Sequence, residues 1–586
     1  MGVVACLLVA APRVWGQEPS PPVQSPGVDV TWGVRIPLRD NIQLNATVYR
    51  PAGSKEPLPV LLGVTPYMAD SDAQAAMFFA RHGYTFVAVD SRGRGNSEGT
   101  YVPFMDDGRD GYDAVEWIAA QSWCNGKVAM WGYSYGGFVQ WAIAKELPPH
   151  LAAILPAAAA YPGVDFPVAK GIFQPGIVEW LTLTRGRTAD FELFSDGAFW
   201  VDKINQLYRQ KLPLEQMDVI VGNPSPIFHT WLANRTNMAY WGQATPSVDQ
   251  YAKINMPILT ITAVYDGDQT GALTYYRRHS EHASTAAASK SFLVIGPWDH
   301  GGTVDPNLEV GGIKLGPASK VNVMQVQKEF LDWNLKAGAR PEFLKKRVAW
   351  YIAGLDEWRY ADRLEDASDS SISLYLHSDG IATSAFHSGR MTQQPPTAES
   401  SDSYTYDPLH VVDAEPGLGV VKDYLIQQRD VMKVNGDGVV YHTDPLPEDM
   451  TMSGPPKLKL WIALDVPDTD FMGTLYEIQP DGTSILLARD ILRARYRKST
   501  NEPVLVKKGE INEYDFTSFP FIGRRIKKGN VLRLVLTPPN PIYFEKNYNG
   551  GGDVAKESGK DAHTAHITVY HDAQHPSALE LPVLQK

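Results

Sequence analysis

A serine flanked by glycines is the clearest sign of chemistry in this chain. Ser134 is the centre of Gly-Tyr-Ser-Tyr-Gly, residues 132–136, which follows the apolar run 127–131. A strand that ends in Gly-x-Ser-x-Gly and continues into a helix forms a sharp turn that exposes the serine hydroxyl. We expect any side chain at Gly132 or Gly136 to collide within this turn. Because so short a pattern also arises by chance, the prediction of a nucleophile depends on partners elsewhere in the sequence.

An acid and a histidine follow in the order that such a nucleophile requires. Asp266 comes after the β-branched run 257–264, and His300 comes after the apolar run 291–295. An acid and a histidine just beyond the carboxyl ends of two strands, in the chain order Ser, Asp, His, are typical of an α/β-hydrolase triad. Asp268 is the rival acid for the same role.

The chemistry assigns a role to each residue type. His300 takes the proton of Ser134 as the serine oxygen attacks a carbonyl carbon, and Asp266 holds the imidazole in the correct tautomer. The backbone N–H of Tyr135, directly after the nucleophile, is expected to face the developing oxyanion. A second oxyanion donor is expected from the loop that follows the predicted strand 58–64.

Two neighbouring motifs are predicted to be structural. The turn 90–95 contains glycines after a strand, but it lacks the spacing and the following helix of a dinucleotide-binding loop. Asp299 precedes His300 directly, and adjacent side chains of an extended chain point in opposite directions. We therefore expect a turn near the site at 90–95 and no triad role for Asp299.

A resemblance to a known family rests on five segments: 87–99, 121–127, 132–137, 265–267 and 296–300. Together they resemble the cocaine esterase and X-Pro dipeptidyl-peptidase group of serine hydrolases, and the resemblance extends from about residue 28 to the end of the chain. It implies an α/β-hydrolase core with a helical cap insertion, followed by a C-terminal jelly roll. It also implies that the second oxyanion donor is the Tyr67 hydroxyl, because the family's Pro-Tyr segment matches residues 66–67.

The resemblance implies acyl hydrolysis but leaves ester and amide substrates open. The group includes X-Pro dipeptidyl-peptidases, α-amino-acid ester hydrolases and glutaryl (cephalosporin) acylases. The amino-acid ester hydrolases bind the substrate ammonium with acids, one of them a glutamate at the position of Gly136. Asp268 and Asp165 could stand in for other members of that cluster. The missing glutamate favours an ester or an acyl group without a free amine. A non-catalytic hydrolase-like binding protein is the alternative from another class.

Composition favours a large enzyme that acts on small molecules. The chain has 586 residues, enough for two or three domains, and 54 basic against 66 acidic residues give a net charge of −12. Basic residues form no long run, which argues against nucleic acid as a partner. The histidines lack metal-ligand spacing and Cys6 and Cys124 are the only cysteines, so we expect no metal, no cofactor and no structural disulfide. The sequence leaves open whether the protein forms a homo-oligomer.

The N-terminus resembles a secretory leader. An apolar run at 3–11, too short to span a bilayer, precedes a linker rich in proline, serine and glutamine that ends near residue 27. We therefore expect residues 1–27 to be a signal peptide with a linker, and the protein to be periplasmic or secreted without a transmembrane span. A frayed tail on a cytoplasmic protein is the alternative, because basic residues are missing before the run.

The order of predicted elements divides the rest of the chain into three parts. Strands separated by helices at 28–160 and 249–347 predict a mostly parallel, doubly wound α/β core. Residues 161–248 are helical and aromatic, and they fall where hydrolases insert a cap. Alternating apolar residues and a hairpin around 480–482 make residues 348–586 an all-β block, a β-sandwich of the jelly-roll type. The core strands are expected at 28–35, 42–50, 60–64, 84–89, 128–131, 151–155, 258–264 and 292–295.

Overall fold

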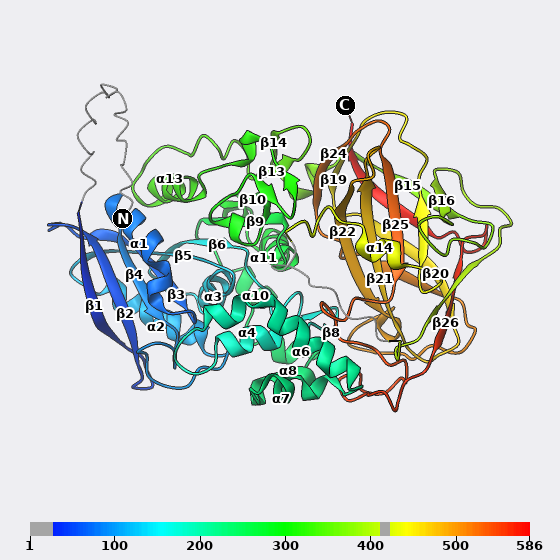
Figure 1. Cartoon of the computed structure of the whole chain (residues 1–586). Coiled ribbons are helices and arrows are strands. Elements are labelled where there is room, and N and C mark those ends of the chain that lie inside the picture. The colour runs from blue at the N-terminus through cyan, green and yellow to red at the C-terminus, as the bar shows by residue number, and fades with distance from the viewer. Residues whose placement is uncertain (1–26, 411–421, 586) are drawn as a thin grey trace, which may run out of the picture.

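The computed structural model describes residues 27–410 and 422–585 and arranges them in three parts (Figure 1). The N-terminal part is built on one sheet, drawn in blue to green, and the C-terminal part on strands drawn in yellow to red. A run of helices inserted in the N-terminal part, between β6 and β9 in sequence, lies along one edge of both parts. The structure therefore has the predicted class, an α/β core with a helical insertion and a C-terminal β domain.

Ten strands form the first sheet within the described residues: β1 (Val28–Pro37), β2 (Gln43–Pro51), β3 (Leu58–Thr65), β4 (Thr85–Asp90), β5 (Cys124–Tyr133), β6 (Leu151–Ala157), β9 (Ile258–Tyr265), β10 (Ser291–Asp299), β13 (Val348–Ile352) and β14 (Glu357–Ala361). Their order is β1-β2-β4-β3-β5-β6-β9-β10-β13-β14. The strands from β4 to β13 in this order pair in parallel, and the outer pairs are antiparallel. All eight strands expected in the core are present.

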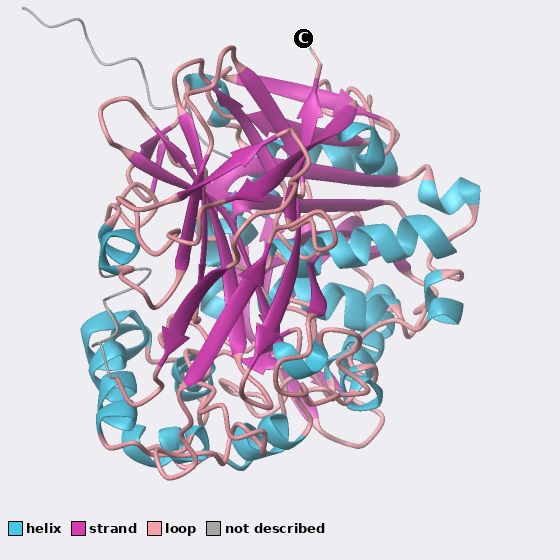
Figure 2. Ribbon diagram, turned by 90° about the vertical axis from the view of Figure 1, so that its right-hand side faces the viewer, coloured by secondary structure: helices cyan, strands magenta, loops and turns pink. Residues whose placement is uncertain are grey.

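Two hydrophobic cores lie on opposite faces of this sheet, and helices lie on both sides of the strands (Figure 2). Along β3, Val60, Leu62 and Val64 face a core shared with α2 (Asp107–Ala119) and α3 (Tyr135–Ala144). Leu61 faces the other core, shared with α1 (Ala73–Arg81) and α13 (Val323–Leu335). Neighbouring residues of a strand point to opposite faces of the sheet. Apolar residues at every position therefore fit a sheet that helices cover on both faces.

The predicted cap is helical, and its aromatic residues are mostly core. Trp180, Trp231 and Trp241 are buried in the same cluster as Phe138 of α3, so the cap packs directly on the helix that follows Ser134. Phe191 is an exception and is exposed. The helices of this segment are α4 (Ile177–Leu183), α5 (Phe191–Ser195), α6 (Gly197–Arg209), α7 (Met217–Val221), α8 (Pro226–Ala233), α9 (Met238–Trp241) and α10 (Val248–Tyr251).

The C-terminal part is the predicted β domain. Leu458, Leu460, Ile462 and Leu464 alternate along one strand and point into one core, and the expected hairpin around 480–482 joins two antiparallel strands. The strands are β15 (Ser370–His377), β16 (Gly389–Thr392), β17 (Asp402–Tyr406), β18 (Val439–His442), β19 (Met450–Gly454), β20 (Lys457–Leu464), β21 (Asp470–Ile478), β22 (Ser484–Arg493), β23 (Asn512–Phe516), β24 (Ile522–Ile526), β25 (Val531–Thr537), β26 (Ala565–Tyr570) and β27 (Ala578–Leu584).

The boundary between the core and the sandwich lies later than the sequence predicts. β13 and β14 belong to the first sheet, where Val348 pairs in parallel with Leu293 of β10, although we expected the sandwich to begin at residue 348. All five residues of β13 are buried. So short an apolar run, without alternation, does not reveal which sheet it joins. The first sheet continues to Ala361, and the first sandwich strand begins at Ser370.

A buried set of charges joins the cap to the sandwich. Arg235 of the cap donates to Glu545 at 3.1 Å and to Asp553 at 2.8 Å. Arg493, which is 1% exposed, donates to the same Glu545 oxygen at 3.0 Å and to both oxygens of Asp470. Loss of one partner would leave a buried charge uncompensated, which is strongly unfavourable. These contacts therefore fix the position of the cap against the sandwich.

Residues 1–26, with most of the predicted signal peptide and linker and Cys6, lie outside the described residues. Cys124 is a buried free thiol. Across residues 27–410 and 422–585, the helices are too short or too polar to cross a membrane.

Candidate active site

The predicted serine turn connects β5 to α3. Ser134 has a φ of 59° and a ψ of −124°, a conformation that non-glycine residues rarely adopt and that is typical of strained functional sites. A Cβ at Gly132, where φ is +154°, would lie 3.0 Å from the Gly136 carbonyl oxygen. The expected collision at Gly136 is wrong, because a Cβ there would lie 3.8 Å from its nearest neighbour, a backbone oxygen of β3. Gly137 is the constrained position instead, since its Cβ would lie 2.5 Å from a backbone oxygen of β6.

A buried glutamine supports this turn. Gln140 of α3 is fully buried, and its side-chain nitrogen donates to the carbonyl oxygens of Gly132 and Gly136 at 3.1 Å. Its side-chain oxygen accepts the N–H of Leu155 in β6 at 2.7 Å. An amide offers both donors and an acceptor, so one side chain pairs the turn with the next strand. We did not predict Gln140 from the sequence; its signal was an amide among the apolar residues of a buried helix.

The ends of β9 and β10 bring the predicted acid and histidine together. Asp266 follows β9, His300 follows β10, and these two strands are parallel neighbours. His300 Nδ1 lies 2.8 Å from Asp266 Oδ1 and 3.7 Å from Asp268 Oδ2. Asp266 also accepts hydrogen bonds from the Thr262 hydroxyl at 3.1 Å and from the Asp268 N–H at 3.0 Å. Asp266 therefore has the geometry of an acid that orients the imidazole, and the rival Asp268 supports it through its backbone.

Three carboxyl groups control the charge of the imidazole. Burial opposes protonation of His300, but Asp266, Asp268 and Asp299 outweigh it and raise the pKa of His300 to about 9. Burial raises the pKa of Asp268 to about 7, although the positive charge of His300 acts in the opposite direction. Burial thus disfavours the charged form of Asp268, and a nearby cation would favour it.

Asp165 of the cap lies in the same electrostatic environment. One of its oxygens accepts the N–H of Tyr161 at 2.8 Å, and the other accepts the N–H of Gly271 in the first turn of α11 (Gln269–His282). Burial and the charge of Asp268 raise the pKa of Asp165 well above its usual range, against the effect of those two backbone donors. The structure thus brings together the two acids that we predicted as substrate-binding residues.

Tyr67 lies where the second oxyanion donor is expected. Its hydroxyl accepts the indole N–H of Trp180 at 2.7 Å and interacts with the side chain of Ser134. Because Trp180 occupies an acceptor position, the phenolic proton is free to point at the serine. Burial raises the pKa of Tyr67 far above its usual value, so the hydroxyl keeps its proton at neutral pH. Trp180 was one of many cap aromatics in the sequence and could not be singled out.

Tyr135 faces the site through its backbone. Its buried ring packs against Phe104 and Trp180, with centroids 5.0 and 5.6 Å away. Its hydroxyl donates to Asp107 at 2.7 Å and accepts the Phe104 N–H at 2.8 Å. The Tyr135 N–H begins α3, and the N–H groups of a first helical turn have no partner within the helix. That N–H is therefore the group that can bind an oxyanion beside Ser134.

A buried arginine holds Tyr67 and Trp180 in place. Arg94 is fully buried, and burial lowers its pKa. Its guanidinium donates to the backbone carbonyls of Pro66, Leu183, Thr184, Gly186 and Thr188. Pro66, whose oxygen is 2.7 Å away, precedes Tyr67, and Leu183 ends the helix that carries Trp180. One side chain thus positions both partners of the Tyr67–Trp180 hydrogen bond, a role that the sequence does not indicate.

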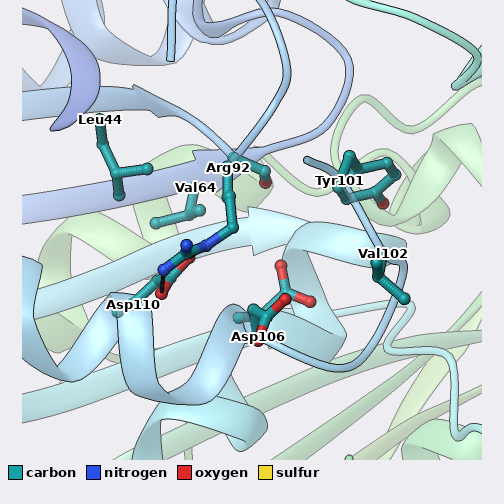
Figure 3. A pocket seen from close by; sticks show the side chains of 10 residues that line it. Leu44, Val64, Arg92, Tyr101, Val102, Asp106 and Asp110 are labelled. Atoms are coloured by element: carbon teal, nitrogen blue, oxygen red, sulfur yellow. Dashed lines mark hydrogen bonds and ion pairs between the residues drawn. The ribbon is translucent and has the colours of Figure 1, made fainter. Parts of the chain in front are cut away.

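The rest of the turn at 90–95 is structural, as predicted. Arg92 pairs with Asp110 of α2 at 2.6 Å, and Figure 3 shows its side chain reaching from the loop to the helix. The Asp90 carboxylate accepts the N–H of Ala69 at 2.7 Å. The cavity beside Arg92 has a volume of about 10 Å³, room for about one water molecule and far too small for a nucleotide.

A larger cavity adjoins the loop that carries Asp266. Its volume is about 550 Å³, and residues of the core, the cap and the sandwich line it. Asp165, Asp266 and Gly267 form part of its wall, and Lys170 and Asp490 form an ion pair at 2.7 Å on another part. Its apolar lining includes Val164, Met238, Val264, Leu425, Met472, Leu486 and Phe544. This size and lining are typical of a small-molecule site.

Among the described residues, one cluster has the spacing of a metal site, and it consists of Asp266, Asp268 and His300. The direct hydrogen bond between His300 Nδ1 and Asp266 Oδ1 uses the atoms that an ion would need. Asp299 accepts the N–H of Gly302 at 2.9 Å and so caps the turn after His300. The cluster is therefore better explained as an acid-base pair than as a metal centre.

Comparisons with known proteins show which family the chain resembles. Residues 40–302 match the sequence model of the X-Pro dipeptidyl-peptidase (S15) family, and residues 337–580 match that of the X-Pro dipeptidyl-peptidase C-terminal non-catalytic domain. The chain is 27% identical to the cocaine esterase of Rhodococcus sp. (strain MB1 Bresler), and the match covers 95% of this chain and 99% of that protein.

Two solved structures share the whole architecture. An aminopeptidase from the marine sediment archaeon Thaumarchaeota archaeon has a TM-score of 0.82 at 20% identity, with 98% of this chain and 99% of that chain covered. An α-amino acid ester hydrolase has a TM-score of 0.83 at 21% identity, again with 98% and 99% covered. At these identities the likeness concerns the fold.

Proposed function

Because the chain belongs to the X-Pro dipeptidyl-peptidase (S15) family of serine hydrolases, we propose that it cleaves a small-molecule ester through an acyl-enzyme on Ser134. His300 is the general base, and Asp266 orients it. One observation carries the proposal: the 2.8 Å hydrogen bond between His300 and Asp266 lies at the same sheet edge as the strained turn that presents Ser134. The likeness to a cocaine esterase over nearly the whole chain supports an ester as the substrate.

The reaction uses His300 twice. Ser134 attacks the ester carbonyl carbon and gives its proton to the imidazole nitrogen opposite Asp266. The tetrahedral intermediate collapses, the alcohol leaves with the proton from His300, and the acyl group stays on Ser134. Water then attacks the acyl-enzyme while His300 takes its proton, and His300 returns this proton to the Ser134 oxygen as the free acid leaves. Asp266 stabilises the imidazolium that forms in both halves, and Thr262 and the Asp268 N–H hold its carboxylate in place.

We assign catalysis to the α/β core, residues 28–160 and 249–347 together with β13 and β14. The cap at 161–248 and the β-sandwich form the remaining walls of the site. The cavity of about 550 Å³ next to the Asp266 loop is lined by all three parts, although its lining includes neither Ser134 nor His300.

A second candidate substrate is an ester of an α-amino acid. The observation in its favour is that the charge of Asp268 raises the pKa of the buried Asp165, so that a cation nearby would be favourable. A substrate ammonium would stabilise both carboxylates. Gly136 argues against this candidate. The amino-acid ester hydrolases have an acid at this position, and a side chain would fit here without collision, yet this chain has glycine.

A matched pair of esters tests the two candidates. Methyl 3-phenylpropanoate and phenylalanine methyl ester differ in the α-ammonium group alone, and comparable kcat/KM values would support the simple ester. A preference of 100-fold or more for phenylalanine methyl ester, on the order of the effect of a buried ion pair, would favour the amino-acid ester.

A burst of p-nitrophenol from p-nitrophenyl acetate, equal in amount to the enzyme, tests the acyl-enzyme itself. A linear release without a burst and without covalent labelling of Ser134 would contradict it.

The pH dependence follows from the charge around His300. We expect kcat/KM to rise with pH through a midpoint near 9, because a general base accepts a proton only in its neutral form. Asp268→Asn removes a negative charge 3.7 Å from Nδ1, which lowers the pKa of His300 and moves the profile to lower pH. The measurement is kcat/KM of a chromogenic ester from about pH 5 to pH 10, with the exposed Asp362→Asn as the control. A midpoint unchanged in Asp268→Asn would contradict the assigned electrostatics.

The Tyr67 hydroxyl is proposed to bind the oxyanion with the Tyr135 N–H. Its hydrogen bond strengthens as charge develops, so Tyr67→Phe should lower kcat by about 100-fold with a much smaller change in KM. The variant also leaves the Trp180 N–H without its acceptor, which costs about 1 kcal/mol of stability. Steady-state kinetics and melting temperature should be measured together, with Tyr112→Phe as the control for loss of a hydroxyl elsewhere. A lower melting temperature with kcat unchanged would reduce Tyr67 to a structural residue.

A further inference from the structure

Exposed aromatic rings are rare in this molecule, and two of them lie at the active site. In residues 27–410 and 422–585, the exposed aromatic side chains are Trp32, Tyr133, Phe191 and Phe386. Tyr133 directly precedes Ser134 and is 41% exposed, although every residue from Val128 to Gly132 in the same strand is buried. Burial of an aromatic ring is strongly favourable, so a ring left open beside a nucleophile is available for a ligand.

Tyr133 and Phe191 each lie next to a different residue of the proposed site. The Tyr133 ring lies 6.0 Å from the His300 ring, at a tilt of 53°. The Phe191 ring lies 6.4 Å from the Tyr67 ring. Tyr133 is therefore the exposed ring next to the imidazole, and Phe191 is the one next to Tyr67.

The position of Tyr133 next to the imidazole decides which part of an ester it meets. His300 delivers its proton to the leaving oxygen when the tetrahedral intermediate collapses, so the leaving alcohol must lie next to the imidazole. The oxyanion, by contrast, must lie against Tyr67 and the Tyr135 N–H. A ring 6.0 Å from the imidazole is thus within stacking range of a group attached to the leaving oxygen.

We propose that Tyr133 is a specificity residue that stacks against the leaving alcohol and makes this enzyme prefer esters of aromatic alcohols. The inference rests on the acyl-enzyme function proposed above and extends it to a substrate class. Trp131 lies two residues earlier on the same face of β5 and is buried in the core below, so the Tyr133 ring stands on a rigid base.

Benzyl acetate and ethyl acetate test this role. Their alcohols have similar basicity, and both esters give the same acetyl-enzyme, so deacylation is identical and the ratio of their kcat/KM values reports contacts with the leaving group. We expect wild-type enzyme to prefer benzyl acetate, and Tyr133→Ala to lower that preference by about 10-fold. Tyr133→Phe keeps the ring and should keep the preference. Phe386→Ala, which removes an exposed ring in the sandwich, should leave it unchanged.

The outcomes separate the role of Tyr133 from the reaction itself. A general loss of structure would lower turnover of both esters alike and leave their ratio unchanged. An unchanged ratio in a Tyr133→Ala enzyme that still turns over both esters would overturn the role of Tyr133, and so would a wild-type enzyme without a benzyl preference. Failure of the acyl-enzyme proposal would be recognised by a different result, because wild-type enzyme would then show neither a p-nitrophenol burst with p-nitrophenyl acetate nor a covalent label on Ser134.

Discussion

Ser134→Ala should lower ester turnover by about 10³-fold or more and leave the fold intact. The change removes the one oxygen that attacks the carbonyl carbon, while Tyr67 and the Tyr135 N–H still bind the substrate oxygen and sustain weak residual hydrolysis. Ser134 is only partly buried, and its φ of 59° is no worse for alanine than for serine. The measurement is kcat with a chromogenic ester beside the melting temperature.

Covalent labelling gives the matched control for this variant. A fluorophosphonate should modify wild-type enzyme at Ser134 and leave Ser134→Ala unlabelled, because only an activated serine attacks the phosphorus. Ser289→Ala, at an exposed serine, should react and turn over as wild type does. Turnover near the wild-type level in Ser134→Ala, or an adduct on another serine, would end the assignment of Ser134 as the nucleophile.

Asp266→Asn should lower kcat by about 10⁴-fold, the effect expected when the orienting acid of a triad becomes an amide. In this site the reason is specific. The Asp266 oxygens accept from the Thr262 hydroxyl, the Asp268 N–H and His300 Nδ1. An asparagine must place its NH₂ group where one of these donors now points, so the imidazole would turn or take the wrong tautomer.

Asp268→Asn is the natural comparison, since it changes the rival acid in the same way. His300 Nδ1 is 3.7 Å from Asp268, too far for a good hydrogen bond, and the Asp268 N–H that supports Asp266 is unaffected. We therefore expect Asp268→Asn to keep most of its activity at its optimal pH. If Asp268→Asn loses more activity than Asp266→Asn toward every ester tested, the two assignments must be exchanged.

The sequence predicts the elements that carry the triad because each depends on short-range patterns. The β-branched run before Asp266 and the apolar run before His300 form adjacent parallel strands, and the glycine-rich turn forms between β5 and α3. Parallel strands end at the same edge of a sheet, so the order Ser, Asp, His was enough to expect proximity. The cap was predictable for a similar reason, because the alternation of strands and helices in the core stops at residue 161.

Long-range contacts explain what the sequence does not reveal. Arg94 holds Pro66 and the end of α4 by hydrogen bonds to backbone carbonyls, which leave no trace in residue identity. Whether Gly136 or Gly137 is constrained depends on the distance to β6, and only the packed sheet sets that distance. β13 joins the first sheet by pairing with β10, a choice that an apolar run of five residues cannot encode alone.

The charges that join the cap to the sandwich also determine when the enzyme can become complete. Arg235 and its partner Glu545 are 310 residues apart in the chain. At a synthesis rate of about 5 to 20 residues per second, about 15 to 60 seconds separate the two residues on the ribosome. During that interval the chain already contains Ser134 and then Asp266 and His300, yet the cap lacks its charged contacts with the sandwich. A chain terminated before residue 545 would carry every residue of the proposed triad without these contacts, so the joint between the cap and the sandwich forms only late in translation.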